Sequence, residues 1–195
     1  KDVSVFEKLE KLMTPSFGNC AAVAIKLAKL MLNETGGHIK LFTMSPPNIG
    51  IGNTKIRDNI RNETDQRLLF FPENNFYSEF SEECASSQIV VDTFLFSSTF
   101  MESSIFSSLS SLTGGQNYYY EQGFTLERDH ERLLHDLRRN INREIGYDAV
   151  MRVRCSTGLS IKRYLGPFYK QVKEEIEITG LDADSTFAIE LEHDD

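Results

Sequence analysis

Two arginines stand two positions apart in the stretch MRVRCSTGLSI, residues 151–161 of an otherwise acidic chain. Apolar and polar residues alternate here, which predicts a β-strand in which every second side chain lies on the same face. Met151 and Val153 would then face a core. Arg152 and Arg154 would face the other way, with their side chains leaving the backbone about 6.5–7 Å apart.

An arginine pair of this kind could bind two acidic groups at once. An extended peptide with acidic residues at positions i and i+2 has the same spacing. The planar guanidinium takes a carboxylate with two hydrogen bonds, which suits Arg better than Lys. The alternative is that Arg152 and Arg154 pair with the chain's own acids, since the chain carries 29 Asp and Glu.

Other candidate sites are weaker. The sequence GIG at 50–52 lacks the third glycine of a dinucleotide-binding loop and follows two prolines, so it predicts a turn. His130 and His135 are five positions apart, which separates them by about 140° around a helix, whereas a zinc helix needs a spacing of four. We find no catalytic constellation and predict a binding protein rather than an enzyme.

Cysteines and glycosylation motifs point to different compartments. Cys20, Cys84 and Cys155 are odd in number and form no C-x-x-C pair, which favours reduced thiols in the cytoplasm. The sequons at Asn33 and Asn62 would instead suit a secreted protein. Motifs this short also arise by chance, and we expect both sequons to be unused.

The composition is that of a globular protein, with 40 % hydrophobic and 26 % charged residues. No apolar run approaches the ~18 residues of a membrane span, and the N-terminal segment is charged where a signal peptide would be apolar. Residues 138–173 hold nine Lys or Arg against two acids, whereas the rest of the chain carries a net charge of −15. This basic block is either a solvated face or a surface for an acidic partner: lipid headgroups, nucleic acid or an acidic peptide.

Hydrophobic patterning predicts alternating helices and strands over most of the chain. Helices are expected at 5–12, 20–32, 75–86, 102–112 and 125–145, and strands at 38–44, 88–98 and 116–121. The apolar run at 88–98 is typical of a parallel strand buried on both faces. This order predicts a parallel α/β sheet with crossover helices.

Two of the helices carry an apolar face. We expect the apolar face of the helix at 20–32 to pack on the sheet. The two faces consist of Val23, Leu27, Leu30 and Met31 in the first helix, and of Leu134, Leu137, Ile141 and Ile145 in the second.

After Gly146 the pattern changes to period-two alternation with a tight STG turn, which predicts antiparallel strands. We therefore expect an α/β domain over 1–146 and a β-sandwich segment over 147–195. Three parallel strands make an incomplete sheet. The first residue is Lys rather than Met, so we expect a piece of a larger protein, with further strands most simply N-terminal to Lys1.

Six stretches occur in a characteristic order between about Phe17 and Leu191: GGHIKLF, PPNIGIG, FYSEFSEEC, QIVVDTFLFS, SLTGGQNYYY and AVMRVRCSTGLSI. Together they resemble the cargo-adaptor subunit of the COPII inner coat, the Sec twenty-four family. The sister coat subunit lacks the R-x-R-C-S-x-G-L stretch, which favours the adaptor. The resemblance implies the C-terminal half of a von Willebrand A-like trunk domain, followed by antiparallel strands of a β-sandwich domain.

The resemblance also implies a non-enzymatic function, the packaging of membrane cargo into vesicles that leave the endoplasmic reticulum. In the family the arginine pair helps to read acidic sorting signals, so Arg152 and Arg154 are the expected cargo-signal-binding residues. The expected partners are the sister coat subunit, the small GTPase of the coat through that heterodimer, the cytosolic tails of cargo and SNAREs, and an acidic membrane surface, but no nucleic acid.

The expected location is the cytoplasm, at the cytosolic face of endoplasmic-reticulum exit sites and COPII vesicles. This segment is expected to hold no cofactor, because the family's structural zinc finger would precede Lys1. A secreted von Willebrand A-like adhesion module is the alternative, and it is motivated by the α/β pattern and the two sequons.

Overall fold

A computed structural model describes residues 18–55, 66–71, 74–97 and 101–193, so the helix predicted at 5–12 lies outside the described residues. The elements are α2 (Ala21–Leu32), β1 (Gly37–Thr43), the 3₁₀ helix η1 (Leu68–Phe70), α4 (Phe76–Ser86), β2 (Ile89–Leu95), α5 (Ser103–Thr113), β3 (Asn117–Tyr119), α6 (Leu126–Asn142), β4 (Ile145–Arg152), β5 (Leu159–Leu165), β6 (Lys170–Val172), β7 (Glu175–Asp182) and β8 (Ala188–His193).

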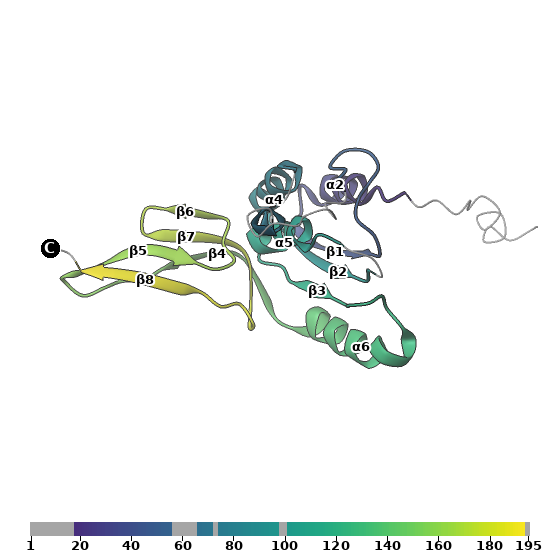
Figure 1. Cartoon of the computed structure of the whole chain (residues 1–195). Helices are drawn as coiled ribbons and strands as arrows, with labels where there is room; N and C mark the ends of the chain where they lie inside the picture. The colour runs from purple at the N-terminus through teal and green to yellow at the C-terminus, as the bar shows by residue number, and fades with distance from the viewer. Residues whose placement is uncertain (1–17, 56–65, 72–73, 98–100, 194–195) are drawn as a thin grey trace, which may run out of the picture.

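The first part of the chain is a three-layer α/β structure (Figure 1). Strands β1, β2 and β3 form a parallel sheet in that order, and every residue of the central strand β2 is buried. Helices α2, α4 and α5 cover one face of the sheet, and α6 covers the other. The predicted fold class, a parallel sheet with flanking helices followed by antiparallel strands, is confirmed.

Alternate residues of β2 serve the two faces of the sheet. Val91 and Leu95 belong to the larger core beneath α4 and α5. Phe94 points to the α6 side, where its ring stacks on Tyr118 with the ring centroids 4.6 Å apart. Tyr120 belongs to the same smaller cluster and is fully buried. Tyr118 and Tyr120 therefore contribute to a core on this face of the sheet.

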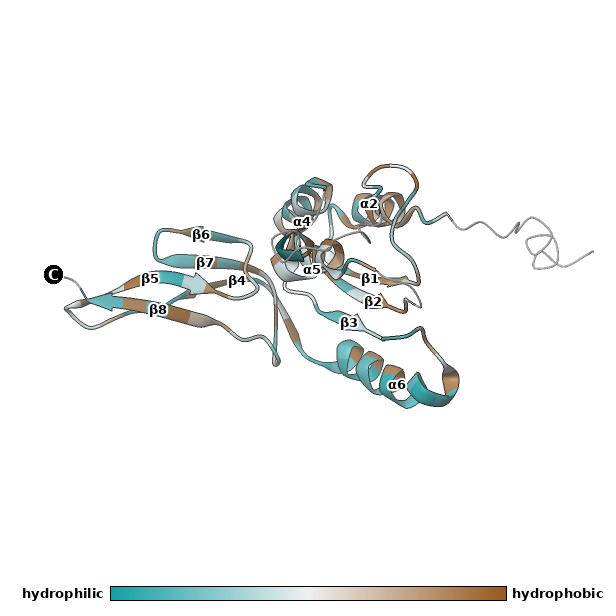
Figure 2. Cartoon of the chain, viewed as in Figure 1, coloured by the Kyte–Doolittle hydropathy of each residue, from teal (hydrophilic) through white to brown (hydrophobic). Residues whose placement is uncertain are grey.

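Helix α2 packs with a different face from the one predicted. Its buried residues are Ala21, Ala22 and Ile25, and the small alanines let the helix approach the sheet closely. Apolar residues surround most of the helix (Figure 2), so the periodicity alone could not select the buried side. The face predicted to be buried is exposed: Val23, Leu27, Leu30 and Met31.

Helix α6 is shorter than predicted. It ends at Asn142, and the predicted last apolar residue, Ile145, is the first residue of β4. Leu133 and Leu137 pack on the sheet, whereas the predicted Leu134 and Ile141 are 36 % and 59 % exposed. The apolar spacing continued across the end of the helix because a new strand happened to supply the next apolar residue.

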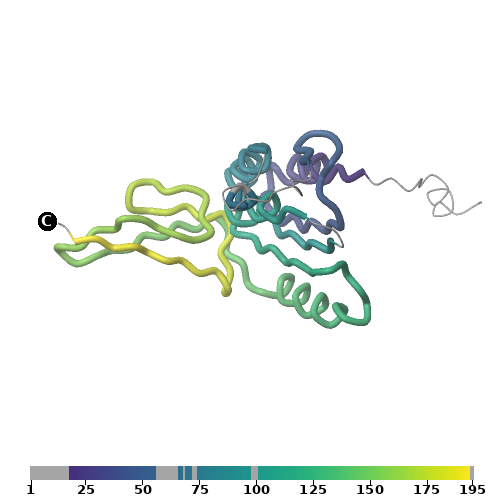
Figure 3. The backbone as a smooth tube through the Cα atoms, in the orientation of Figure 1, coloured from purple at the N-terminus to yellow at the C-terminus, as the bar shows by residue number. Residues whose placement is uncertain are grey.

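The rest of the chain forms two antiparallel sheets, with strand orders β4-β7-β6 and β5-β8. Their inner faces share a core of Tyr164, Ile176 and Ile178. Figure 3 follows the chain from α6 into β4 and shows the connection between β7 and β8 turning back at the α/β part. The start of β4 and the connection between β7 and β8 thus both lie at the first domain.

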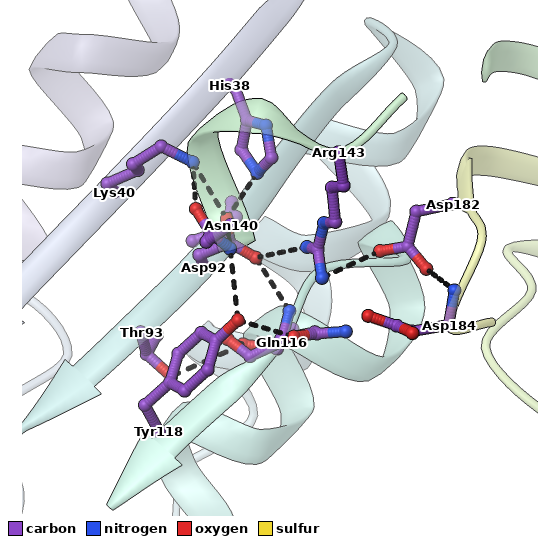
Figure 4. Close-up of polar contacts among 12 residues, drawn as sticks. His38, Lys40, Asp92, Thr93, Gln116, Tyr118, Asn140, Arg143, Asp182 and Asp184 are labelled. Carbon is purple, nitrogen blue, oxygen red and sulfur yellow. Dashed lines mark hydrogen bonds and ion pairs between the residues drawn. The ribbon is translucent and has the colours of Figure 1, made fainter. Parts of the chain in front are cut away.

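A buried carboxylate joins β1, β2, β3 and α6 (Figure 4). Asp92, in the middle of β2, is fully buried, with His38 Nε2 2.6 Å and Lys40 Nζ 3.1 Å from its Oδ2. The Gln116 backbone N–H and the Asn140 side-chain amide each donate a hydrogen bond of 2.7 Å to it. Burial alone would raise the pKa of Asp92, but these hydrogen bonds and the charge of His38 hold it well below its usual range.

Arg143 extends this network into the second domain. Its guanidinium is 5 % exposed and lies between two acids, with Nη2 3.8 Å from Asp92 Oδ1 and Nη1 3.0 Å from Asp182 Oδ2 at the end of β7. Nearer the surface, Arg139 Nε donates a hydrogen bond of 2.8 Å to Asp184 Oδ2. Charged side chains of α6 and the residue that follows it therefore hold the β7–β8 region against the sheet.

The two domains also meet through their backbones at a pair of glycines. A Cβ added to Gly114, at the end of α5, would lie 2.1 Å from the carbonyl oxygen of Gly180 in β7. One added to Gly180 would lie 2.4 Å from Cγ2 of Val90. Only glycine at both positions permits this approach, and Gly114 also has a φ of 74°.

Replacing Asp92 by asparagine should lower the free energy of unfolding at neutral pH by about 3 kcal/mol, because it leaves buried cations without their shared anion. The pKa of Asp92 is lowered by folding from about 3.9. Its contribution is therefore complete above about pH 4 and is lost as the pH falls below that value.

Urea unfolding at neutral pH and at about pH 3 measures both effects. The asparagine variant should lose less stability on acidification than the unaltered chain. Asp184→Asn removes the partner of the exposed Arg139 and serves as the control with a smaller effect. An Asp92→Asn protein as stable as the original at neutral pH would contradict this account.

Candidate functional site

The two arginines lie at the end of β4, on its exposed side. The strand ends at Arg152, and the chain continues through Arg154 without pairing in a sheet. Met151 and Val153 pack against the core around Tyr164, whereas both arginines are exposed. The predicted alternation of buried and exposed residues is confirmed.

A cleft of about 450 Å³ opens beside this strand. Cationic and apolar side chains share its lining, and it lies between the end of β4, the start of β5 and the turn that joins β6 to β7. Its lining includes Arg152, Arg154, Lys173, Tyr164, Leu159 and Ile161. Such a cleft suits an acidic group with an apolar neighbour.

The two arginines are not equivalent. Nη2 of Arg152 contacts the Glu174 carboxylate, and Nη1 lies 3.6 Å from Oε1 of Glu175. An internal partner, the alternative considered from the sequence, is thus present for Arg152. In the part of the chain that the structure describes, the side chains of Arg154 and Lys173 have no ion pair or hydrogen bond. Of the two arginines, Arg154 is therefore the one that is open to an external anion.

Tyr164 positions the two sides of the cleft. Its side chain is 4 % exposed, and its hydroxyl accepts a hydrogen bond of 3.3 Å from the Val153 backbone N–H. The same hydroxyl donates a bond of 2.7 Å to the carbonyl oxygen of Glu174. The Tyr164 hydroxyl thus joins the segment that carries Arg152 and Arg154 to the turn between β6 and β7.

Neither Tyr164 nor Glu174 was singled out from the sequence. Both roles depend on which residues of β4, β5 and β7 lie opposite one another, and the register pairs Arg152 with Glu175. The acidic run KEEIE, which leads into β7, is the available signal in the sequence. It could not show which acid would meet which arginine.

Folding neutralises much of the basic block at 138–173. Antiparallel pairing and the domain junction bring acids from 174–190 against it, and Asp92 adds one from β2. Arg138, Arg154, Lys170 and Lys173 remain without such a partner among the described residues. The cations that have acidic partners are Arg139, Arg143, Arg152, Lys162 and Arg163.

The cysteines are free thiols in three settings: Cys84 is buried, Cys20 is exposed, and Cys155 borders the cleft. Burial raises the pKa of Cys84 to about 12, which marks it as a core residue. Within the described residues, no group of three or more His, Cys, Asp or Glu could hold a metal ion. In the same residues, no helix has the length and apolar character to traverse a lipid bilayer.

Comparison with known proteins identifies the family. Residues 5–141 match the family model of the Sec23/Sec24 trunk domain, and residues 146–195 match that of the Sec23/Sec24 beta-sandwich domain. The human protein transport protein Sec24C is 38 % identical over 165 residues, which cover 83 % of this chain and 15 % of the relative. The chain belongs to the Sec24 family.

Other members of the Sec24 family give the same result. Protein transport protein SEC24 B of Arabidopsis thaliana is 34 % identical over 178 residues, which cover 88 % of this chain and 16 % of that protein. The crystal structure of the human COPII-coat protein Sec24c matches with a TM-score of 0.86 and 35 % identity, over 93 % of this chain and 24 % of that one. The chain thus spans less than a quarter of each of these relatives.

Replacing Tyr164 by phenylalanine should lower the free energy of unfolding by about 1–3 kcal/mol, because the Val153 N–H and the Glu174 carbonyl lose their shared partner. Chemical unfolding measures this change, and faster amide exchange at Val153 should accompany it. Tyr147→Phe, at a tyrosine that is 44 % exposed, should stay within about 0.5 kcal/mol of the original. Equal losses at both tyrosines would show that the Tyr164 hydroxyl has no special role.

Proposed function

We propose that this chain is part of a COPII coat subunit that selects membrane cargo for transport from the endoplasmic reticulum to the Golgi. It would do so by binding acidic sorting signals in the cleft beside Arg152 and Arg154. The observation that carries the proposal is the exposed Arg154 guanidinium, which borders the cleft without an internal partner among the described residues. The relatives reported above, which are protein transport proteins and a COPII-coat protein, support it.

The chemistry of the cleft suits binding rather than catalysis. A carboxylate can take two parallel hydrogen bonds from the Arg154 guanidinium, and Lys173, which also lines the cleft, adds positive charge. Leu159 and Ile161 offer an apolar surface for a neighbouring side chain. An extended acidic peptide is therefore the ligand class that these groups favour.

The proposal includes the setting of a coat subunit. We infer that the complete protein pairs with the sister inner-coat subunit and through it with the small GTPase of the coat. The cytosolic tails of membrane cargo and SNAREs would be its ligands, at the cytosolic face of exit sites. The secreted adhesion module has less support, because the relatives reported above are protein transport proteins and a COPII-coat protein.

Peptide binding to the complete natural protein tests the proposal. A fluorescent peptide with acidic residues at i and i+2 should bind, and Arg152→Ala/Arg154→Ala should weaken binding at least about tenfold, because charge-assisted hydrogen bonds are lost. The measurement is fluorescence anisotropy, with an alanine-substituted peptide as the ligand control.

Lys162→Ala/Arg163→Ala is the matched protein control. It also removes two positive charges from the same domain, but the side chains of Lys162 and Arg163 pair with Glu190 and do not line the cleft. Its affinity should stay within about twofold of the original. If the Arg152/Arg154 variant binds as tightly as the unaltered protein, the cleft is not a cargo site.

We also propose a weak attraction to anionic membranes. The cations left after internal pairing could each contribute about 1 kcal/mol when held near a negatively charged surface. Lys170→Ala/Lys173→Ala should therefore reduce flotation with anionic liposomes and leave flotation with neutral liposomes unchanged. Flotation that ignores both salt and anionic lipid would refute an electrostatic contribution.

A further inference from the structure

We propose that Glu174 occupies the Arg152 half of the cleft in the free protein and that a second acidic group of a bound peptide must displace it. The inference rests on the proposed cargo-binding function and adds a specificity-determining residue to that site. In this arrangement a peptide with one acid uses Arg154 alone. A peptide with two acids also competes with Glu174 for Arg152.

The unequal state of the two arginines is the first observation. Glu174 lines the cleft and contacts Nη2 of Arg152, so a carboxylate of the chain itself stands where a ligand carboxylate would bind. Arg154 borders the same cleft on the same side of the chain without such a partner. One of the two anion positions is therefore filled, and the other is open.

The side chain of Glu174 can move without disturbing the fold. Its side chain is 64 % exposed and that of Arg152 is 46 % exposed, so water can replace either partner. Its backbone is held separately, through the bond from the Tyr164 hydroxyl to its carbonyl oxygen. The preceding Lys173 has a positive φ of 57°, as a tight turn requires. The carboxylate can rotate into solvent while the turn stays in place.

Glu175 has a different role from Glu174. It lies directly opposite Arg152 in the antiparallel register, and its Oε1 is 3.6 Å from Nη1 on the other branch of the guanidinium. It does not line the cleft. Displacement of Glu174 would therefore free Nη2 for a ligand while Glu175 keeps the guanidinium oriented.

The test compares two peptides on the complete natural protein, one with Glu-Ala-Glu and one with Glu-Ala-Ala at the same positions. Glu174→Gln should tighten binding of the two-acid peptide about threefold to fivefold, the range expected when an exposed ion pair no longer has to be broken. Binding of the one-acid peptide should change by less than about twofold. The ratio of the two affinities, measured by fluorescence anisotropy, is the decisive quantity.

Three variants separate contact from charge. Glu174→Asp keeps the charge but shortens the side chain, so the ratio should rise in the same direction as for Gln. Glu144→Gln makes the same charge change at an exposed residue just before β4, outside the cleft, and should leave the ratio unchanged. Glu82→Gln, on the exposed side of α4, controls for net charge. Thermal unfolding of each variant should match the original, because these acids are exposed.

The outcomes distinguish the inference from the function on which it rests. If binding of the two-acid peptide depends on Arg152 and Arg154 but Glu174→Gln leaves the ratio unchanged or lowers it, Glu174 is not a displaced occupant. If binding of the two-acid peptide does not depend on Arg152 and Arg154, the proposed cargo-binding function is wrong, whatever the effect of Glu174→Gln. A rise in affinity of both peptides by the same factor would mean that Glu174 acts through general electrostatics, and it would overturn the inference as well.

Discussion

The buried carboxylate of Asp92 constrains more of this structure than any other group. An isolated charge in the middle of a fully buried strand would be costly, so partners must reach it from every neighbouring element. His38 and Lys40 come from β1, Asn140 comes from α6, and Arg143 follows directly after that helix. These demands select the face of α6 that meets the sheet, and they fix the point from which the chain leaves for β4. Strand β4 therefore begins where it does because of a buried charge in the α/β domain, away from the cleft.

Sequence patterns predicted the parts of the fold that depend on burying continuous apolar surface. The run at 88–98 marked the central strand, and the period-two alternation around Arg152 marked an exposed side of β4. Patterns failed to predict the buried face of a helix where several of its faces are apolar, as on α2, or where buried polar contacts determine that face. Asn140 is fully buried on α6 because it serves Asp92, and no hydrophobic period records such a bond. Partners across sheets, such as Glu174 for Arg152, depend on a register that one sequence does not show.

The distribution of charge illustrates the same limit. Along the chain, positive residues gather in 138–173 and acids gather after it, which indicates a strongly basic surface. The antiparallel pairing of β4 with β7 and of β5 with β8 brings the two segments together, and most of the basic residues form ion pairs within the fold. Of the four cations that remain without an acidic partner among the described residues, Arg154 and Lys173 lie beside one cleft. A cationic site thus arises where internal pairing stops, rather than where basic residues are most frequent.

The glycine contact between α5 and β7 has a mechanical consequence. Gly114 and Gly180 bring two backbones together with no side chain between them, and an ion pair between Arg143 and Asp182 lies at the same junction. Joints of this kind lack the soft side-chain layer that lets domains hinge. A load applied at the end of β4 would pass into the α/β sheet through main-chain contact and buried ion pairs. The two domains would then transmit force as one rigid unit.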